Sequence, residues 1–318
     1  MVYNEFVETM KQALQDRFGA GYSVKVHQVP KNNGVLLDGL SILPPDSLLA
    51  PTIYLSPYYE LHLQGVPEDQ ILDEIFTLFT RNPPPCAFSA DQLTAFEPLK
   101  TKVLMKLVHA DSNHDLLAEI PYVKFLDLAV IFYLLLEKND DGQMTLLINN
   151  EHLKLWNISR KELFRLALAN TPLACPAQIQ SMNEAIRESA MQSLGDSCDE
   201  TALEKLMDEE DCVSPLYVLS NTSGIYGACC LLYRDLLKDF AESIGADLIL
   251  IPSSIHEILI APLEGGASFN RLNAMVSDIN ASEVPPEDQL SDHIYLYTRG
   301  DDRIQAVLPP ENLTRLPR

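Results

Sequence analysis

Apolar residues recur along the chain with two different periods, and each period predicts a different element. Near the start, apolar side chains return every fourth residue and share one face of a helix; they are Phe6, Met10, Leu14 and Phe18. The run 22–29 instead alternates apolar and polar residues, which is typical of a strand. Asn32-Asn33-Gly34 follows as a turn whose Asn-Gly step tolerates positive φ. We therefore predict a hairpin with its return strand at 35–43, a third strand at 51–55 and a helix after Pro67.

A longer stretch, 122–136, is almost continuously apolar. Without a polar face it is expected to be covered on both sides, and it is shorter than the roughly 20 residues of a bilayer-spanning helix. The segment 143–148 comes after the turn signal Asp140-Asp141-Gly142. We predict that this segment pairs antiparallel with the apolar stretch if both are strands.

Local signals mark two helices after this stretch. Ser159 and Glu162 have the spacing of a capping box, which predicts a helix over 160–169. Asn170-Thr171-Pro172 is expected to end it, because proline cannot continue the helical hydrogen-bond ladder. A further helix is predicted over 177–193.

Eight acidic residues and one lysine lie between Gly195 and Cys212. A run of like charges repels itself and prefers solvent. We predict a linker at 195–212 between an N-terminal α+β region, 1–194, and a C-terminal α+β region, 213–318. An interaction segment is the alternative interpretation of the same charges.

The C-terminal region alternates short strands with helices. Its predicted strands are 216–220, 225–232, 248–251, 256–261 and 294–297. Its predicted helices cover 236–244, closed by Gly245 as a left-handed C-cap, and 269–279. The predicted fold class is therefore α+β, with antiparallel sheets, packed helices and two units joined by the acidic linker.

The charge balance narrows the possible partners. Against 23 Lys and Arg stand 45 Asp and Glu, which leaves a formal net charge of −22 over 318 residues. Duplex nucleic acid is excluded as a general partner, because neutralising phosphates needs clustered cations. The first residues carry charges throughout and form no secretion signal, and six cysteines make no CxxC pair. We expect a cytoplasmic protein with reduced thiols and no membrane partner.

Common cofactor and metal motifs are missing from the sequence. Only 13 residues are glycine, and none forms a phosphate-cradling pattern. The seven histidines never form HExxH, and no Cys/His group has zinc spacing. We expect no cofactor and no metal.

One turn brings a nucleophile, an imidazole and a carboxylate together in sequence. Ser253, Ser254 and His256 lie there between two predicted strands, and Glu257 follows. The first three residues are candidate catalytic groups. However, His256 and Glu257 point to opposite faces of a strand, and triad members normally come from separated segments. The alternative is a capped turn in which serine hydroxyls accept backbone N–H groups.

Two further patches are candidate binding sites. Tyr226 and Gly227 precede small residues that allow close backbone approach, and they could form a pocket floor or serve only for packing. Tyr54, Tyr58 and Tyr59 form an aromatic patch beside Pro57, which could bind a partner or simply end a strand.

Six segments carry a resemblance to other sequences: KNNGVLLDGLSI (31–42), PTIYLSPYYE (51–60), FLDLAVIFYLLLE (125–137), LINNEHLKLWNISRKELFRLALANTP (147–172), YVLSNTSGIYGACCLLY (217–233) and ILIPSSIHEILIAP (249–262). Together they resemble an uncharacterised bacterial family, a domain of unknown function that is frequent in anaerobic gut clostridia. The segment 147–170 is also similar to part of a second uncharacterised family from bacilli. Neither resemblance implies a catalytic residue.

Two classes of function stay open. The first is a non-enzymatic binding or regulatory protein that meets an unknown protein or small molecule through its acidic surface or its tyrosines. The second is a hydrolase or ligand-modifying enzyme that uses the turn with Ser253, Ser254 and His256, which requires these groups to converge in one pocket. An acidic mimic of nucleic acid ranks third, because only the net charge suggests it.

Overall fold

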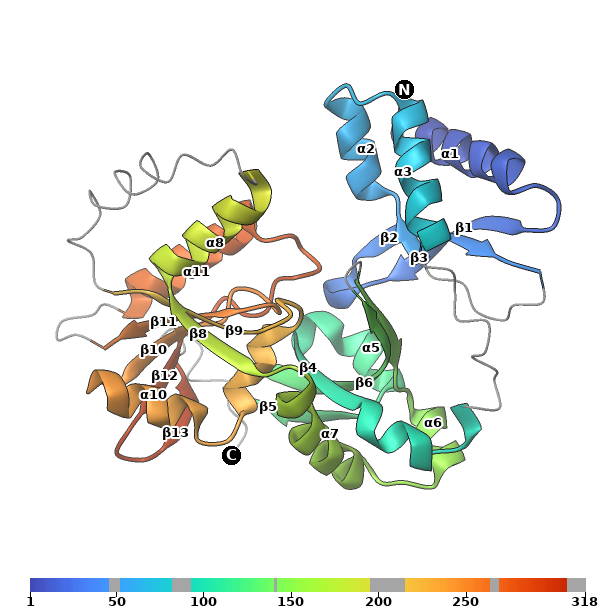
Figure 1. Cartoon of the computed structure of the whole chain (residues 1–318). Coiled ribbons are helices and arrows are strands. Elements are labelled where there is room, and N and C mark those ends of the chain that lie inside the picture. Colours follow the sequence, from blue (N-terminus) through green and yellow to red (C-terminus); the bar gives the residue numbers. More distant parts are fainter. Residues whose placement is uncertain (46–51, 82–92, 140–141, 195–214, 264–268, 308–318) are drawn as a thin grey trace.

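The protein has a mixed α+β fold in which every sheet is antiparallel (Figure 1). A computed structural model describes residues 1–45, 52–81, 93–139, 142–194, 215–263 and 269–307. Both the α+β class and the antiparallel sheets agree with the prediction from sequence. Within the described part of the chain, every helix is too short or too polar to cross a bilayer.

The N-terminal unit packs three helices on a small sheet. Its elements are α1 (Tyr3–Phe18), β1 (Ser23–Pro30), β2 (Leu36–Leu43), β3 (Thr52–Tyr54), α2 (Ser56–Leu63) and α3 (Glu68–Arg81). The strand order is β1-β2-β3, and the predicted hairpin is confirmed with Ser23 opposite Leu43. Its turn places Asn33 at φ 59° and Gly34 at φ 72°. The apolar faces of the helices and the sheet enclose a separate core around Phe6, Leu40 and Ile75.

The middle unit is a four-stranded sheet with helices beside it. Its elements are η2 (Glu97–Lys102), β4 (Val103–His109), η3 (Asp111–Asn113), α5 (His114–Glu119), β5 (Tyr122–Phe125), β6 (Leu128–Asn139), β7 (Gly142–Leu147), α6 (Asn150–Trp156) and α7 (Arg160–Ala174). The apolar stretch 122–136 is two strands, because Leu126 adopts φ 55° and turns the chain. β4 lies along one edge of β6, and β5 and β7 pair with the start and end of its other edge. The predicted pairing of β7 with the apolar stretch is confirmed.

The prediction that Asn170-Thr171-Pro172 ends the helix after Ser159 is wrong. The Ser159 hydroxyl accepts the Glu162 N–H as expected, but α7 continues through Pro172 to Ala174. Thr171 is buried, and its hydroxyl donates to the Ala167 carbonyl and accepts from the Met105 N–H. The lost hydrogen bond at proline is therefore offset by packing of the last helical turn on β4.

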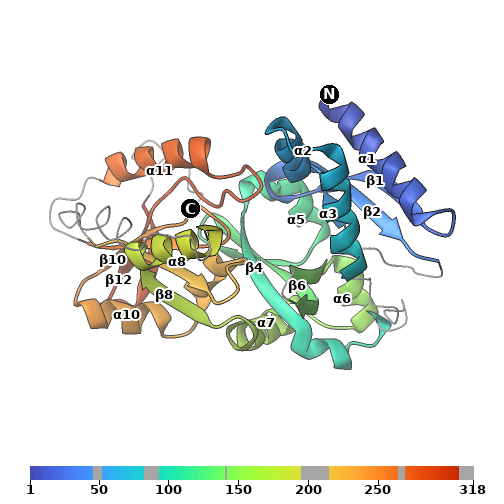
Figure 2. The ribbon, with the colours of Figure 1, turned by 45° about the horizontal axis from the view of Figure 1, so that its top comes forward.

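The C-terminal unit is a six-stranded sheet with the order β13-β12-β10-β11-β9-β8. Its elements are β8 (Ala177–Ser181), α8 (Met182–Leu194), β9 (Tyr217–Asn221), η5 (Gly227–Leu232), α10 (Leu236–Ile244), β10 (Leu248–Ile251), β11 (Ile258–Pro262), α11 (Phe269–Glu283), β12 (Tyr295–Thr298) and β13 (Arg303–Ala306). The helices α8 and α11 lie on one side of this sheet and α10 lies on the other (Figure 2). Successive residues of β10 therefore face two different cores, and all four are buried.

Two predictions for this unit are wrong. The segment 177–193 is not one helix, because its first five residues pair with β9 and only the remainder forms α8. The segment 225–232 is not a strand but a bend followed by the 3-10 helix η5. In both places contacts with distant segments override the local pattern. The left-handed cap at Gly245 is confirmed, with φ 73°.

The predicted acidic linker at 195–212 lies outside the described residues. The strands on either side of it, β8 and β9, pair with each other from Ala177 opposite Asn221 to Ser181 opposite Tyr217. The boundary that we predict there therefore does not separate two sheets. The largest core also combines β4, β6 and α7 with the strands of the C-terminal unit.

Candidate functional site

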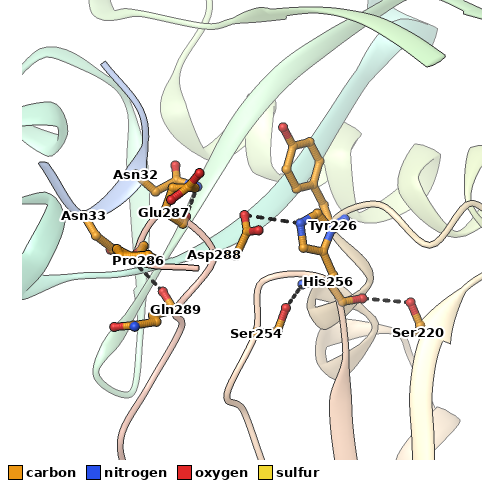
Figure 3. Close-up of polar contacts among 10 residues, drawn as sticks. All are labelled: Asn32, Asn33, Ser220, Tyr226, Ser254, His256, Pro286, Glu287, Asp288 and Gln289. Carbon is orange, nitrogen blue, oxygen red and sulfur yellow. Dashed lines mark hydrogen bonds and ion pairs between the residues drawn. The ribbon is translucent and has the colours of Figure 1, made fainter. Parts of the chain in front are cut away.

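Three parts of the chain meet at the tip of the β1–β2 hairpin (Figure 3). The Asn33 side-chain amide donates to the carbonyl oxygens of Pro286 (2.8 Å) and Gln289 (2.7 Å). The Asn33 N–H donates to the Oδ1 of Asn113 at 2.8 Å, and the Asn32 amide donates to the Glu287 carbonyl at 3.2 Å. The left-handed φ of Asn33 directs its side chain and its N–H to these partners, a conformation that asparagine tolerates better than most residues.

His256 lies beside this contact, in the bend before β11, and its polar atoms are occupied. Its Nδ1 accepts the Tyr226 N–H at 3.3 Å, and its Nε2 lies 3.3 Å from Oδ1 of Asp288. In the neutral ring Nε2 therefore carries the proton and points it at the carboxylate. The His256 N–H donates to the Ser254 hydroxyl (3.0 Å), and its carbonyl accepts from the Ser220 hydroxyl (2.8 Å).

Tyr226 adopts φ 57°, and its ring stacks on the His256 ring with centroids 5.8 Å apart and planes inclined by 13°. The next residue, Gly227, makes this approach possible. A Cβ atom at Gly227 would collide with the Ser220 hydroxyl and the His256 carbonyl. Only glycine fits between β9 and the His256 bend, so the chain can bring Tyr226 over the imidazole.

Two lysines at this place were not predicted from the sequence. Lys106 projects from β4, and its ammonium lies 4.3 Å from the centroid of the Tyr226 ring. Lys31 precedes the hairpin turn, and its ammonium lies 3.7 Å from the centroid of the Tyr54 ring. Lys106 is the only charged residue in the apolar run 103–108, and this was the signal that could have drawn attention to it.

The environment changes the acidity of two of these groups. The pKa of Lys106 is lowered to about 8, mainly because the group is buried and also because of the charge of Lys31, while the carboxylate of Asp288 opposes both effects. Burial also raises the pKa of Tyr226, and the nearby Tyr54 and Asp288 act in the same direction. The Tyr226 hydroxyl is therefore neutral near pH 7, while Lys106 is largely but not completely protonated.

We call this place the junction, because it joins the N-terminal unit, β4 and the C-terminal unit. It consists of Lys31, Asn32, Asn33, Tyr54, Lys106, Tyr226, Gly227, His256 and the loop 286–289.

The structure brings some of the predicted site residues together and leaves others apart. Tyr226, Gly227 and His256 meet at the junction. Ser253 and Ser254 are nearby but buried, and the Ser254 hydroxyl is engaged as the cap of the turn, as the alternative interpretation expected.

Of the predicted aromatic patch, Tyr54 on β3 lies at the junction, whereas Tyr58 and Tyr59 on α2 do not join it. Tyr59 packs its ring against Tyr3 and Phe6 and donates its hydroxyl to the Met1 carbonyl. Tyr58 is half-buried against the same core. A cavity of about 350 Å³ lies at the turn between α2 and α3, and no junction residue lines it.

Fold and site together define an α+β protein in which ionisable side chains from three parts of the chain gather at one junction. The chain belongs to a family of unknown function, DUF5688, whose model matches residues 3–299. The match confirms the resemblance to an uncharacterised family, and it spans every residue of the junction. No curated protein and no solved structure matches the chain.

Proposed function

We propose that this chain is a non-enzymatic binding or regulatory protein of the cytoplasm, and that it binds its ligand at the junction. The observation that carries the proposal is that both ring nitrogens of His256 are occupied. Both of its ring nitrogens have protein partners, Nδ1 with the Tyr226 N–H and Nε2 with Asp288. A general base needs a free nitrogen within hydrogen-bond distance of the proton that it removes.

The serines of the same turn support this view. A serine hydrolase needs a hydroxyl aimed at the imidazole and open to substrate. Here the Ser254 hydroxyl accepts the backbone N–H of His256, and both Ser253 and Ser254 are buried, at 8% and 7% exposure. His256 and Ser254 both bond within the bend that holds Tyr226, which supports a structural role for this turn.

The position of the junction favours a regulatory role. Its side chains come from the N-terminal unit, from β4 and from the C-terminal unit, so a ligand there would touch all three. A ligand that binds only the docked arrangement stabilises that arrangement by mass action. The chain can thereby couple ligand concentration to the docking of its N-terminal unit on the loop 286–289.

The proposal is tested with a small-molecule extract of the native cell. The purified full chain is incubated with the extract, the protein is separated by filtration, and mass spectrometry follows each compound before and after the protein is denatured. A binding protein removes a compound from the filtrate and returns it unchanged on denaturation. Loss of a compound together with formation of a product would overturn the proposal.

A ligand-modifying enzyme is the second candidate, and one observation favours it. Lys106 combines a pKa of about 8 with a neighbouring Tyr226 ring, and a lysine of lowered pKa can act as a nucleophile or base. In the extract experiment this candidate requires a product that the wild type forms and Lys106→Met does not. If the turn with Ser253, Ser254 and His256 forms the product instead, His256→Ala should not form it.

A further inference from the structure

We infer that the junction binds the oxyanion of a small molecule, a phosphate or carboxylate group, between the ammonium groups of Lys31 and Lys106. This inference rests on the proposed function, because it names the ligand class of the same site. It starts from an imbalance of charge. The chain carries a formal charge of −22, yet two lysines reach this place from different units, Lys31 over the Tyr54 ring and Lys106 over the Tyr226 ring.

Neither lysine forms an ion pair of the kind that several other cations in the described part of the chain form. Ammonium groups lie against carboxylates in the pairs of Lys11 with Glu8 and Lys154 with Glu151, for example. Within the described residues, the contacts of Lys31 and Lys106 are the faces of Tyr54 and Tyr226. An aromatic face attracts a cation but accepts no hydrogen bond of ordinary strength, so N–H donors of both ammonium groups remain available.

Among the described residues that act on the pKa of Lys106, one is a carboxylate, Asp288. The charge of Lys31 destabilises the protonated form of Lys106, and the carboxylate that opposes this effect is Asp288. Asp288 is shared, because its Oδ1 also faces Nε2 of His256. An anion between the two lysines would remove their repulsion and accept their free N–H groups at once.

The flanking groups favour an oxyanion that belongs to an organic molecule. The rings of Tyr54 and Tyr226 provide apolar surface beside the cations, and the neutral Tyr226 hydroxyl can donate a hydrogen bond. A dianionic phosphate matches two ammonium groups better than a single carboxylate does. We therefore expect inorganic phosphate, as a probe, to bind more tightly than acetate.

The first experiment measures thermal unfolding of the full chain with inorganic phosphate, acetate or chloride at constant ionic strength. Phosphate is expected to raise the Tm of the wild type by about 2 °C or more over chloride, which corresponds to roughly 1 kcal/mol of binding linkage. Lys31→Met and Lys106→Met are expected to lose this rise. Their matched controls, Lys25→Met on β1 and Lys124→Met on β5, remove exposed lysines and should keep it.

The controls separate binding from the general stabilising effect of phosphate, which acts on every variant alike. An equal rise in wild type and Lys106→Met would overturn the inference, and so would the absence of any rise in the wild type. Lys106→Arg keeps the charge and is expected to recover part of the effect. If a variant fails to fold, calorimetric titration of the wild type with phosphate still decides the matter.

Calorimetry at pH 8 gives a second readout. An anion beside Lys106 favours its protonated form, so binding is expected to take up protons, and the measured heat should change with the ionisation enthalpy of the buffer. Failure of this inference differs from failure of the proposed function. If the compound bound from the extract is uncharged and is returned unchanged, only the inference of an oxyanion ligand is overturned. If phosphate binds and a phosphorylated compound is turned over, only the non-enzymatic role is overturned.

Discussion

The imidazole ring of His256 lies almost parallel to the phenol ring of Tyr226, 30 positions earlier in the chain, with the ring centroids 5.8 Å apart. The backbone N–H of Tyr226 donates to Nδ1 of the same imidazole, so one residue contacts the ring through both its side chain and its main chain. The contact depends on the close approach of Gly227 to the carbonyl of His256. Substitution of Gly227 is therefore expected to disturb the packing of the bend more than substitution of His256.

Replacing Gly227 by alanine is expected to destabilise the protein by about 1–3 kcal/mol, the usual cost of forcing extra atoms into a packed site. The added methyl group meets the Ser220 hydroxyl, the His256 carbonyl and the Asn221 N–H, and two of these are backbone groups that cannot turn away. Urea unfolding measures the effect. Gly300→Ala is the control, because its new Cβ would meet nothing within 4 Å, and it should change stability by less than about 0.5 kcal/mol. Equal stability of the two variants would show that the bend is loosely packed.

Asn33→Gly tests whether the hairpin tip holds the N-terminal unit on the rest of the chain. Glycine keeps the left-handed backbone but loses the side-chain bonds to Pro286, Gln289 and Asn113. We expect amide hydrogen exchange in the loop 286–290 to become at least about tenfold faster, because three side-chain bonds of roughly 1 kcal/mol each are lost.

Asn157→Gly is the matched control for this change. Asn157 also has a left-handed φ, 52°, but it is exposed at the end of α6. The loop 286–290 should exchange at the wild-type rate in this variant. If exchange were unchanged in Asn33→Gly as well, the hairpin tip would not hold the N-terminal unit on this loop.

Local signals were sufficient to predict those elements whose ends are set by neighbouring residues. The Asn-Gly step of the first hairpin, the Ser159 cap and the Gly245 cap each act within a few residues, and all three are in place. The errors fall where a distant partner decides the outcome. Residues 177–181 have no local reason to leave a helix, and they do so because β9 offers them a sheet edge.

The junction could be predicted only in part for the same reason. The sequence predicts His256 and Tyr226 as candidate residues of two separate patches, and nothing in it indicates that they touch. Lys31 and Asp288 lie more than 250 positions apart, and each looks like an ordinary surface charge in its own segment. Lys106 was the exception, since a lysine inside an apolar strand needs a special environment.

Leu134→Ala is expected to lower the free energy of unfolding by about 2–5 kcal/mol, because Leu134 is fully buried in the largest core. Chemical unfolding measures the loss. Leu173→Ala near the end of α7 is the control, since its side chain is 82% exposed and its removal should cost less than about 0.5 kcal/mol. A loss below about 1 kcal/mol for Leu134→Ala would show that β6 is not the centre of the core.

A charged lysine at the junction is expected to cost the protein stability. The pKa of Lys106 is about 8 in the folded chain and 10.5 when it is solvated, so between these values the unfolded chain holds the extra proton. This group therefore makes the protein less stable below pH 8, and the penalty disappears as the pH rises toward 10.5. Lys106→Met removes the penalty at every pH.

We therefore expect Lys106→Met to be more stable than the wild type at pH 7, by at most about 3 kcal/mol, and the difference to shrink steadily from pH 8 to pH 9.5. The upper pH limit keeps the nearby Tyr226, whose pKa is raised, in its neutral form. Urea unfolding of both proteins across this range, without phosphate, gives the difference directly, and Lys124→Met on the exposed side of β5 should show no such trend. A constant difference between wild type and Lys106→Met would mean that Lys106 is solvated, and the repulsion from Lys31 on which the anion site depends would then be absent.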